Sequence, residues 1–342
     1  MRPIAPALFC LLSFGCLPDP DIQVPDLSLG GVPVDAGVSP RSDGPIGDLG
    51  VAHWTADLTL GTAQTLRATW VADGGPSEMF VVGQAGLILP RVGTGPWQVE
   101  TSGTDANLYA VTARSAAEVY AVGDRGVILR RTGGKWLPEG AELRSSAALC
   151  SAAVLAGGEV VAVGDGGLAA IRGTAGVWTA ETASTLAGAA LRAVAGSKLD
   201  SLTAVGLGGL IVRRGATGWA ADPLPVDPLA RGNYYAVAQA GDGVYVVGEY
   251  GLVLTRGGDR WAWEKLTPPM GMVAPLHLYG ASIQDGELFV VGAAGYAAHK
   301  PTNNGAWTVE NSGGTADLYG IYGAGARTLF AVGSAGTLLR RF

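Results

Sequence analysis

A five-residue motif, Val-Gly-x-x-Gly, occurs seven times in this chain. The first glycines of the seven copies are Gly83, Gly123, Gly164, Gly206, Gly248, Gly292 and Gly333, at intervals of 40, 41, 42, 42, 44 and 41 residues. A repeat of this length, built from short apolar runs and glycine turns, is typical of the blades of a β-propeller. The repeat therefore constrains the architecture more strongly than any other feature of the sequence.

The second copy shows the pattern of one blade most clearly. Four β-rich runs, 108–111, 118–122, 127–131 and 135–139, are separated by short turns. Such a pattern predicts an antiparallel four-stranded meander. Because the runs are apolar on both sides, we expect each sheet to be covered on both faces by its neighbours. The sequence therefore predicts an all-β fold, a seven-bladed β-propeller of four-stranded antiparallel blades over residues 51–342.

The two ends of the repeat region complement each other. In six copies a tryptophan follows the third run, and an acidic residue stands three positions after it. The seventh copy stops at Phe342 before this tryptophan, whereas Trp54 and Asp57 stand alone before the first copy. We therefore predict that the N-terminal segment supplies the outermost strand of the last blade. This overlap closes the ring and removes exposed sheet edges.

A cation stands five residues after the second glycine of every copy. In the second copy, Arg131 and Trp136 flank a four-residue turn, so they are expected to face each other across a hairpin. Stacking of a guanidinium on an indole contributes about 0.5–1 kcal/mol at exposed sites. We interpret the cations as structural, with the acidic residues compensating their charge, and a polyanion-binding surface is the alternative. The seven cations are Arg91, Arg131, Arg172, Arg214, Arg256, Lys300 and Arg341.

Residues 1–16 have the pattern of an export signal with a lipobox-like end. Arg2 precedes an apolar run, Ile4 to Phe14, that is too short to span a bilayer. The run ends in Leu-Ser-Phe-Gly-Cys, which resembles a bacterial lipobox with its leucine one position further from the cysteine than usual. The resemblance implies lipidation of Cys16. Since Leu17 rather than aspartate follows, it also implies an outer-membrane lipoprotein at the periplasmic face or the cell surface; ordinary signal cleavage is the alternative.

Residues 17–50 and the cysteines complete this view of the N-terminal part. The segment is rich in proline, aspartate, glycine and serine, which predicts a disordered tether. Of the three cysteines, Cys10 would leave with the signal and Cys16 would carry lipid. Cys150 then remains alone, so we expect a buried small residue and no intramolecular disulfide.

The second residue of each first run is the main candidate for binding a ligand. Large side chains dominate this position, and the residue that follows is always small. If the first run is innermost, these side chains line a polar funnel at the propeller axis; the alternative is that they only fill space beside the small residues. The funnel candidates are Arg67, Tyr109, Arg192, Tyr235, Tyr279 and Tyr319, with Cys150 at the equivalent position of the third copy.

The longest insertion between copies, residues 266–276, is the candidate for a partner-binding loop. It is apolar and contains several prolines, which is unusual for a loop exposed to water. Its candidate contact residues are Pro268, Pro269, Met270, Met272 and Pro275.

Composition and motif content exclude several classes of function. The net charge of −6 and a pI of about 5.1 disfavour nucleic acid and anionic membrane surfaces as partners. The three histidines have no metal-ligand spacing, and the glycine motifs lack the helix that presents amides to a pyrophosphate. We therefore predict no metal, no cofactor and no catalytic residues in a monomeric propeller whose only membrane attachment is the lipid.

The repeat, Val-Gly-x-x-Gly followed by an apolar strand, a cation and Gly-x-Trp, resembles the repeats of photosystem II assembly-factor-like propellers. It also looks like a degenerate form of the bacterial neuraminidase (Asp-box) repeat, although the aspartate of that box is missing, as in Arg131-Thr132-Gly133-Gly134-Lys135-Trp136. The resemblance covers about residues 51–342 and implies the fold, because propellers of this kind serve many functions.

Two hypotheses of function remain from the sequence. The favoured one is a non-enzymatic scaffold at the bacterial outer membrane that binds an envelope protein or a glycan and assists assembly of an envelope complex. The alternative is a glycan-active lyase or glycosidase that works in the funnel. An enzyme of that kind needs paired carboxylates or a Tyr/Glu couple at the axis. The six funnel candidates contain no carboxylate.

Overall fold

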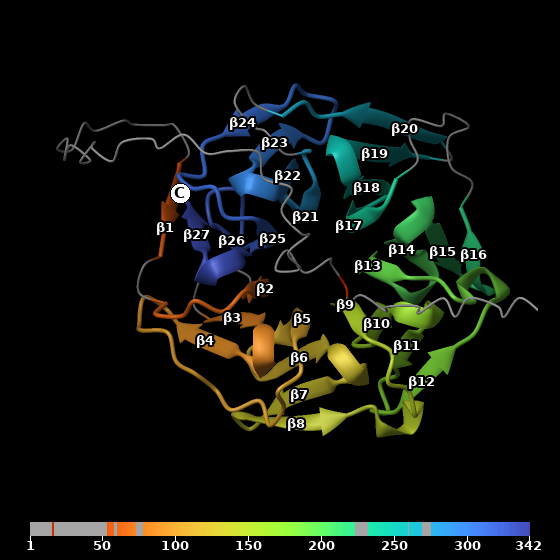
Figure 1. Ribbon diagram of the computed structural model, residues 1–342. Coiled ribbons are helices and arrows are strands. Elements are labelled where there is room, and N and C mark those ends of the chain that lie inside the picture. The colour runs from red at the N-terminus through yellow and green to blue at the C-terminus, as the bar shows by residue number, and fades with distance from the viewer. Residues whose placement is uncertain are drawn as a thin grey trace, which may run out of the picture.

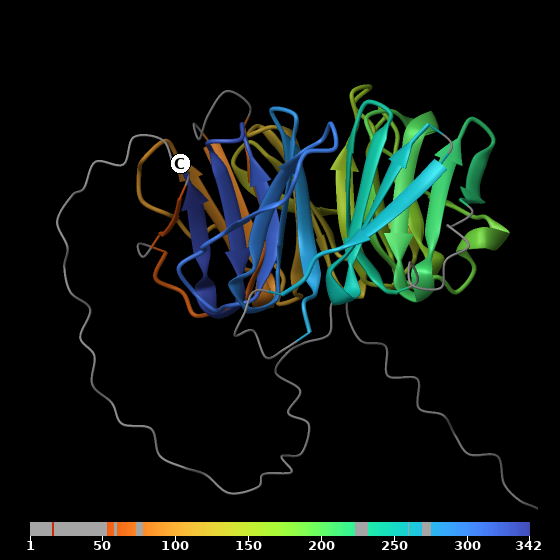
Figure 2. The same cartoon turned by 90° about the horizontal axis from the view of Figure 1, so that it is seen from above.

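The computed structural model describes residues 16, 53–57, 60–72, 78–222, 232–258, 260–268 and 275–342. Seven antiparallel sheets surround a central axis, as Figure 1 shows along that axis. Seen from the side, the strands run between the two faces of a short cylinder (Figure 2). The predicted seven-bladed all-β propeller is confirmed.

The first four sheets, in chain order, form blades 1 to 4. Blade 1 contains β2 (Leu66–Val71), β3 (Glu78–Gly83) and β4 (Ile88–Val92). Blade 2 contains β5 (Leu108–Ser115), β6 (Glu118–Gly123), β7 (Ile128–Thr132) and β8 (Lys135–Glu139). Blade 3 contains β9 (Leu149–Val154), β10 (Val160–Gly164), β11 (Ala169–Arg172) and β12 (Trp178–Glu181). Blade 4 contains β13 (Leu191–Ala195), β14 (Leu202–Gly206), β15 (Ile211–Gly215) and β16 (Gly218–Ala221).

The remaining sheets form blades 5 to 7, and short 3₁₀ turns connect strands in every blade. Blade 5 contains β17 (Tyr234–Ala240), β18 (Gly243–Gly248), β19 (Leu252–Gly257) and β20 (Arg260–Lys265). Blade 6 contains β21 (Leu278–Gln284), β22 (Glu287–Gly292), β23 (Ala297–Pro301) and β24 (Thr308–Glu310). Blade 7 contains β25 (Leu318–Gly323), β26 (Leu329–Gly333), β27 (Leu338–Arg341) and β1 (Trp54–Ala56). The 3₁₀ turns are η1 (Gln84–Gly86), η2 (Asp124–Gly126), η3 (Ala141–Leu143), η4 (Asp165–Gly167), η5 (Ser184–Leu186), η6 (Leu199–Ser201), η7 (Leu207–Gly209), η9 (Glu249–Gly251), η10 (Ala293–Gly295) and η11 (Ser334–Gly336).

Blade 1 has three regular strands, and an extended segment takes the place of the fourth. The backbone N–H of Gln98 donates to the carbonyl of Pro90 over 3.1 Å, and that of Glu100 donates to Ile88 over 3.1 Å. Pro90 has no N–H to return the first of these bonds, so the ladder is incomplete. The segment therefore occupies the outer position without regular strand pairing.

The ring closes where the sequence predicts it. β1 pairs with β27 in the register Trp54↔Arg341, Thr55↔Arg340 and Ala56↔Leu339. Segments from the two ends of the repeat region thus share one sheet, with β1 and β27 side by side (Figure 1). The prediction of closure by an N-terminal strand is confirmed.

The first glycine of every motif, and the second glycine of six motifs, stand where the backbone of another segment comes too close for a side chain. A Cβ on Gly123 would lie 2.0 Å from the carbonyl oxygen of Asn107, the residue just before the innermost strand of the same blade. A Cβ on Gly126 would lie 2.3 Å from the carbonyl oxygen of Ser145, in the connection to the next blade. Gly126 also has φ of +69°, which favours glycine. The motif thus fixes turn geometry and contact with the next blade.

The recurring acidic residues join neighbouring blades. Glu139 at the end of blade 2 accepts hydrogen bonds from Arg172 Nε at 2.9 Å and from Trp178 Nε1 at 3.1 Å, both in blade 3. Seven such pairs surround the ring: Asp57–Arg91, Glu100–Arg131, Glu139–Arg172, Glu181–Arg214, Asp222–Arg256, Glu264–Lys300 and Glu310–Arg341. The cations are structural, as predicted. Each acid lies on the opposite face of its own blade from the cation there, and therefore pairs with the cation of the next blade.

Apolar side chains fill the spaces between the blades. In the cluster between blades 2 and 3, Tyr120 of β6 and Trp178 of β12 are each at most 2% exposed. Their ring centroids lie 6.5 Å apart at an interplanar angle of 77°, an edge-to-face contact. Every blade therefore depends on its neighbours for burial of its core, as expected for runs that are apolar on both sides.

The N-terminal predictions lie almost entirely outside the described residues. The signal at 1–16 is described only at Cys16, and the tether at 17–50 is not described. Within the described part of the chain, no helix has the length and apolar character needed to cross a membrane.

Removing the closing strand should destabilise the whole ring. A chain that begins at residue 59 lacks β1 and Asp57, so it loses the partner of β27 and two of the inter-blade contacts. We expect its melting temperature to fall by ~10 °C relative to a chain that begins at residue 51. The reason is that removing one partner of a buried pair reduces the free energy of unfolding by about 3 kcal/mol. Calorimetry and light scattering measure both stability and association. Equal stability and a monomeric state for both chains would contradict closure.

Loss of one inter-blade carboxylate should reduce the stability of the fold far more than loss of an exposed carboxylate. Glu310 accepts from Arg341 at 2.6 Å and from Trp54 Nε1 at 2.5 Å, and its side chain is 7% exposed. We expect Glu310→Gln to reduce the free energy of unfolding by about 3 kcal/mol, because the arginine stays buried without its counter-charge. The control is Asp105→Asn, whose side chain is 86% exposed beside Arg125 and should leave stability unchanged. Equal denaturant midpoints for the two variants would refute this.

Candidate functional site

A β-bulge occurs at the second residue of the innermost strand in all seven blades. In blade 2, Leu108 pairs with Gly123 and Ala110 with Val122, so Tyr109 is left between them without a partner. A bulge re-aims the side chain of the extra residue. The seven residues at this position, named here the bulge ring, are Arg67, Tyr109, Cys150, Arg192, Tyr235, Tyr279 and Tyr319.

The bulge ring lines a central channel. All seven residues belong to the wall of one cavity of about 520 Å³ on the propeller axis. The structure thus brings together the six funnel candidates that the sequence indicates, together with Cys150. Their role in ligand binding stays a prediction.

Small residues beside the bulge ring let the innermost strands approach one another. A Cβ on Gly320 would lie 2.7 Å from the carbonyl oxygen of Arg67, and one on Gly280 would lie 3.1 Å from that of Tyr319. Crowding of backbones around the axis therefore explains the small third residue of each innermost strand. The large second residues project past this crowded layer.

Aromatic and cationic side chains contact one another around most of the bulge ring. Tyr279 has ring centroids 5.6 Å from Tyr235 and 5.5 Å from Tyr319. The guanidinium of Arg67 lies 4.7 Å from the Tyr319 ring and 5.9 Å from the Tyr109 ring. Five of the seven bulge-ring residues therefore form a continuous row of contacts, in which Arg67 stands between Tyr319 and Tyr109.

Three carboxylates also reach the bulge ring, and the sequence analysis missed them. Asp124, Asp165 and Glu249 each follow the first glycine of a motif, and each backbone N–H donates to the carbonyl of the residue just before the innermost strand of its blade. Glu249 Oε1 accepts from the Tyr235 hydroxyl at 3.0 Å. The six funnel candidates themselves contain no carboxylate, but carboxylates from the turn tips stand beside them. The sequence did not reveal these carboxylates because the turn tip and the start of the innermost strand are far apart in sequence. In the structure the two are hydrogen-bonded in every blade.

Burial and nearby carboxylates raise the pKa values of tyrosines in the bulge ring. Burial, and then the charge of Glu249 and the hydrogen bond to it, raise the pKa of Tyr235 far above its usual value. Burial and the charges of Asp317 and Glu249 raise the pKa of Tyr279 to about 12. Burial opposes ionisation of Glu249, but hydrogen bonds from Asn233 and Tyr235 outweigh it and lower the pKa of that carboxyl. At neutral pH the site therefore holds neutral phenols beside an ionised carboxylate.

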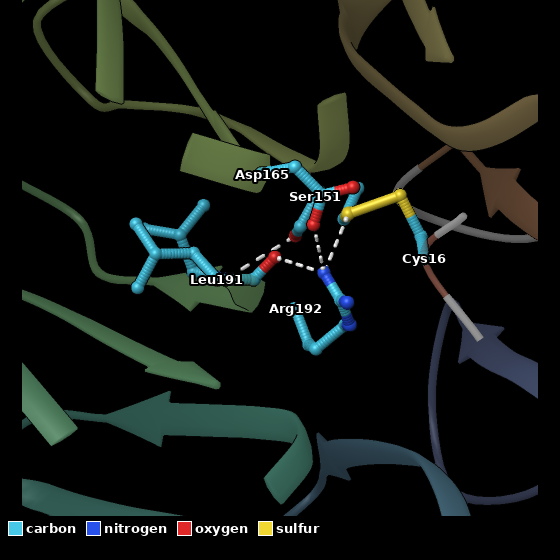
Figure 3. Close-up of a disulfide and its surroundings, with 7 residues drawn as sticks. Cys16, Ser151, Asp165, Leu191 and Arg192 are labelled. Atoms are coloured by element: carbon cyan, nitrogen blue, oxygen red, sulfur yellow. Dashed lines mark hydrogen bonds and ion pairs between the residues drawn. A yellow bond between two sulfur atoms is a disulfide. The ribbon is translucent and has the colours of Figure 1, made fainter. Parts of the chain in front are cut away.

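The two arginines of the bulge ring have different partners. Arg192 Nη1 lies 2.7 Å from Asp165 Oδ1 and 3.1 Å from the carbonyl oxygen of Leu191, to both of which it donates (Figure 3). Arg67 has no acceptor for its Nε and Nη1 within the described residues. The charge of Arg192 is thus compensated, and that of Arg67 is not.

Cys16 forms a disulfide with Cys150 of the bulge ring. The sulfurs are joined beside Arg192, whose Nη1 lies 3.4 Å from Cys150 Sγ (Figure 3). Cys16 is 4% exposed and belongs to the wall of the same central cavity as the bulge ring. The expectation that Cys150 has no disulfide partner is wrong, because it assumed that Cys16 is lipidated. A sulfur in a disulfide cannot carry a thioether-linked lipid, so the two states of Cys16 exclude each other within one molecule.

The candidate partner loop is described only at its ends. Pro268 and Pro275 are exposed, whereas Pro269, Met270 and Met272 lie outside the described residues. Leu266 and Leu276 are buried and hold both ends of the loop in the cluster between blades 5 and 6. Among the described residues, no group of three or more His, Cys, Asp and Glu side chains is arranged to hold a metal ion.

Comparisons with known proteins show the fold. No protein-family model and no curated protein matches the chain. YCF48 from Cyanidioschyzon merolae is 19% identical, with 84% of this chain and 98% of that chain aligned at a TM-score of 0.66. A streptogramin B lyase is 11% identical over 85% of this chain and 97% of its own, at a TM-score of 0.72. The WD40 propeller domain of Doa1 is 14% identical, with 82% of this chain and 94% of that chain aligned at a TM-score of 0.66. Propellers of diverse function thus share this architecture.

Peptide mapping should decide the state of Cys16. Proteolysis without reductant should yield one fragment pair linking Cys16 to Cys150, which separates on reduction and is missing from a Cys150→Ser variant. Because the bond spans 134 residues of sequence, we expect reduction to lower the free energy of unfolding by about 2–5 kcal/mol. A lipid-bearing Cys16 peptide together with a free Cys150 thiol would contradict the disulfide and establish the lipoprotein interpretation.

Proposed function

We propose that this chain is a non-enzymatic scaffold that binds a partner protein at the bulge-ring end of its central channel. The observation that carries the proposal is the convergence of one bulged side chain from each blade on a single aromatic surface at the axis. Tyrosine and arginine are enriched where proteins bind one another, since they provide large contact area together with hydrogen-bonding groups. The sheets behind the ring hold these side chains in place.

The fold neighbours are compatible with this proposal. They include a structure of YCF48 bound to D1 peptide, 17% identical at a TM-score of 0.66, and the WD40 domain of Doa1. At such identities the likeness concerns architecture, so the support for partner binding in this chain is the bulge ring itself.

A glycan-active enzyme is the second candidate, and one contact favours it. Tyr235 and Glu249 form a hydrogen-bonded couple of 3.0 Å at the axis, and lyases are among the fold neighbours. A tyrosine nucleophile needs a lowered pKa, and a general acid needs a raised one. The pKa of Tyr235 is raised and that of Glu249 is lowered. Both shifts oppose such catalysis, so we favour binding over chemistry.

The proposed location is the bacterial cell envelope. The signal-like residues 1–16 support export, and the Cys16–Cys150 disulfide fits an oxidising compartment. Attachment to the outer membrane through lipid on Cys16 requires molecules that lack this disulfide. We therefore propose an exported scaffold whose partner is an envelope protein, with lipid anchoring confined to molecules in which Cys16 is free of the disulfide.

Site-specific crosslinking in cells tests the proposed interface. A photoreactive phenylalanine analogue replaces Tyr279, an aromatic bulge-ring residue that is partly exposed, and in the control it replaces Leu137, 49% exposed on the outer strand β8. We expect one envelope protein to be captured from position 279 and not from position 137. Capture from neither position, together with turnover of envelope glycans that Tyr235→Phe abolishes, would refute the scaffold and support the enzyme.

A further inference from the structure

Arg67 carries a buried charge that the structure leaves uncompensated. The residue is 7% exposed. Its Nε and Nη1 have no hydrogen-bond acceptor, and no carboxylate pairs with it in the described ranges. Removing a cation from water without a partner is unfavourable by several kcal/mol. Most buried polar groups in native proteins are satisfied, so such an exception calls for an explanation.

The surroundings of Arg67 hold its guanidinium at the channel without neutralising it. The rings of Tyr319 and Tyr109 lie 4.7 and 5.9 Å from it. Cation–π attraction compensates only part of the lost hydration. The bulge at Arg67 aims the side chain into the cavity of about 520 Å³. Arg67, which carries these unsatisfied donors, therefore forms part of the wall of a space large enough for part of a ligand.

We propose that the channel mouth is a carboxylate-binding site in which Arg67 binds one acidic side chain of an extended partner segment. The proposal deepens the scaffold function and rests on it, because it names the chemistry of the partner. A guanidinium matches a carboxylate in charge and in hydrogen-bonding geometry. The tyrosines beside it provide apolar surface for the methylene groups of the same side chain.

The charges around the ring favour a single negative charge over a polyanion. Asp124, Asp165 and Glu249 reach the bulge ring and would repel additional negative groups. Asp165 is already paired with Arg192, so Arg67 is left as the cation with free donors. One carboxylate therefore compensates the charge of Arg67, whereas a phosphate or a run of acidic residues adds further negative charge beside these acids.

A peptide titration tests this inference. The probe is the peptide acetyl-Gly-Glu-Gly-amide, and its control is the same peptide with glutamine. Binding is followed by NMR of the arginine side-chain N–H groups in the full chain. We expect the glutamyl peptide to shift the Arg67 signal, the glutamine peptide not to shift it, and Arg67→Gln to weaken binding at least about tenfold. The matched control Arg260→Gln, at an exposed position of β20, should bind within about twofold of the parent.

A stability measurement separates binding from a purely structural role. A buried arginine that serves ligand binding destabilises the protein when no ligand is bound. We therefore expect Arg67→Gln to melt at the same temperature as the parent or higher. Arg67→Lys keeps the charge and should retain part of the binding. Equal affinity of Arg67→Gln and parent for the glutamyl peptide, or equal affinity of the parent for both peptides, would overturn the proposal. Binding of acetate as tightly as the glutamyl peptide would also overturn the proposal, because it would assign the site to a free small acid.

The outcomes for this site and for the scaffold can be told apart. If position 279 captures a partner while Arg67→Gln leaves peptide binding unchanged, the scaffold stands and the carboxylate site is refuted. If the glutamyl peptide binds through Arg67 while position 279 captures nothing, the carboxylate site stands and the scaffold is refuted.

Discussion

The carboxylate at the end of each outer strand is the interaction on which the ring depends. It forms an ion pair with a cation one blade further on, and in several blades it also accepts a hydrogen bond from a tryptophan. Such a pair is weak evidence for stability in isolation, since desolvation offsets its attraction. Here seven pairs recur around a closed ring, so each fixes the position of two sheets relative to each other. Asp57 completes the series only because β1 crosses to the last blade.

The same repeat that builds the ring also builds its candidate site. The first glycine of each motif lets the chain just before the innermost strand come close, and the bulge beside it sends one large side chain toward the axis. The turn tip hydrogen-bonds to that same region, which brings Asp124, Asp165 and Glu249 to the bulge ring. Scaffold and site therefore cannot be separated in this fold, because one local geometry produces both.

Pseudo-sevenfold symmetry is broken where chemistry is possible. Equivalent positions hold four tyrosines, two arginines and a cysteine in a disulfide. Among the residues that the structure describes, Arg192 has an acid partner and Arg67 has none, although both stand at the same backbone bulge. The shared backbone of the seven blades does not require such differences. They indicate the side of the channel at Arg67 as the place where a ligand would gain most from binding, because donors there have no acceptor among the described residues.

The sequence alone determined the number of blades, the closure by residues near Trp54 and the meeting of the funnel residues, because all three follow from the period of the repeat. It also indicated that the cations are structural, but it could not pair them, since each acid pairs with the recurring cation of the following blade rather than with that of its own. The carboxylates at the bulge ring and the Cys16–Cys150 disulfide depend on contacts between segments far apart in sequence. Only the tertiary structure decided these, because spacing along the chain sets the repeat, whereas the approach of distant segments sets which charges are compensated and which sulfurs meet.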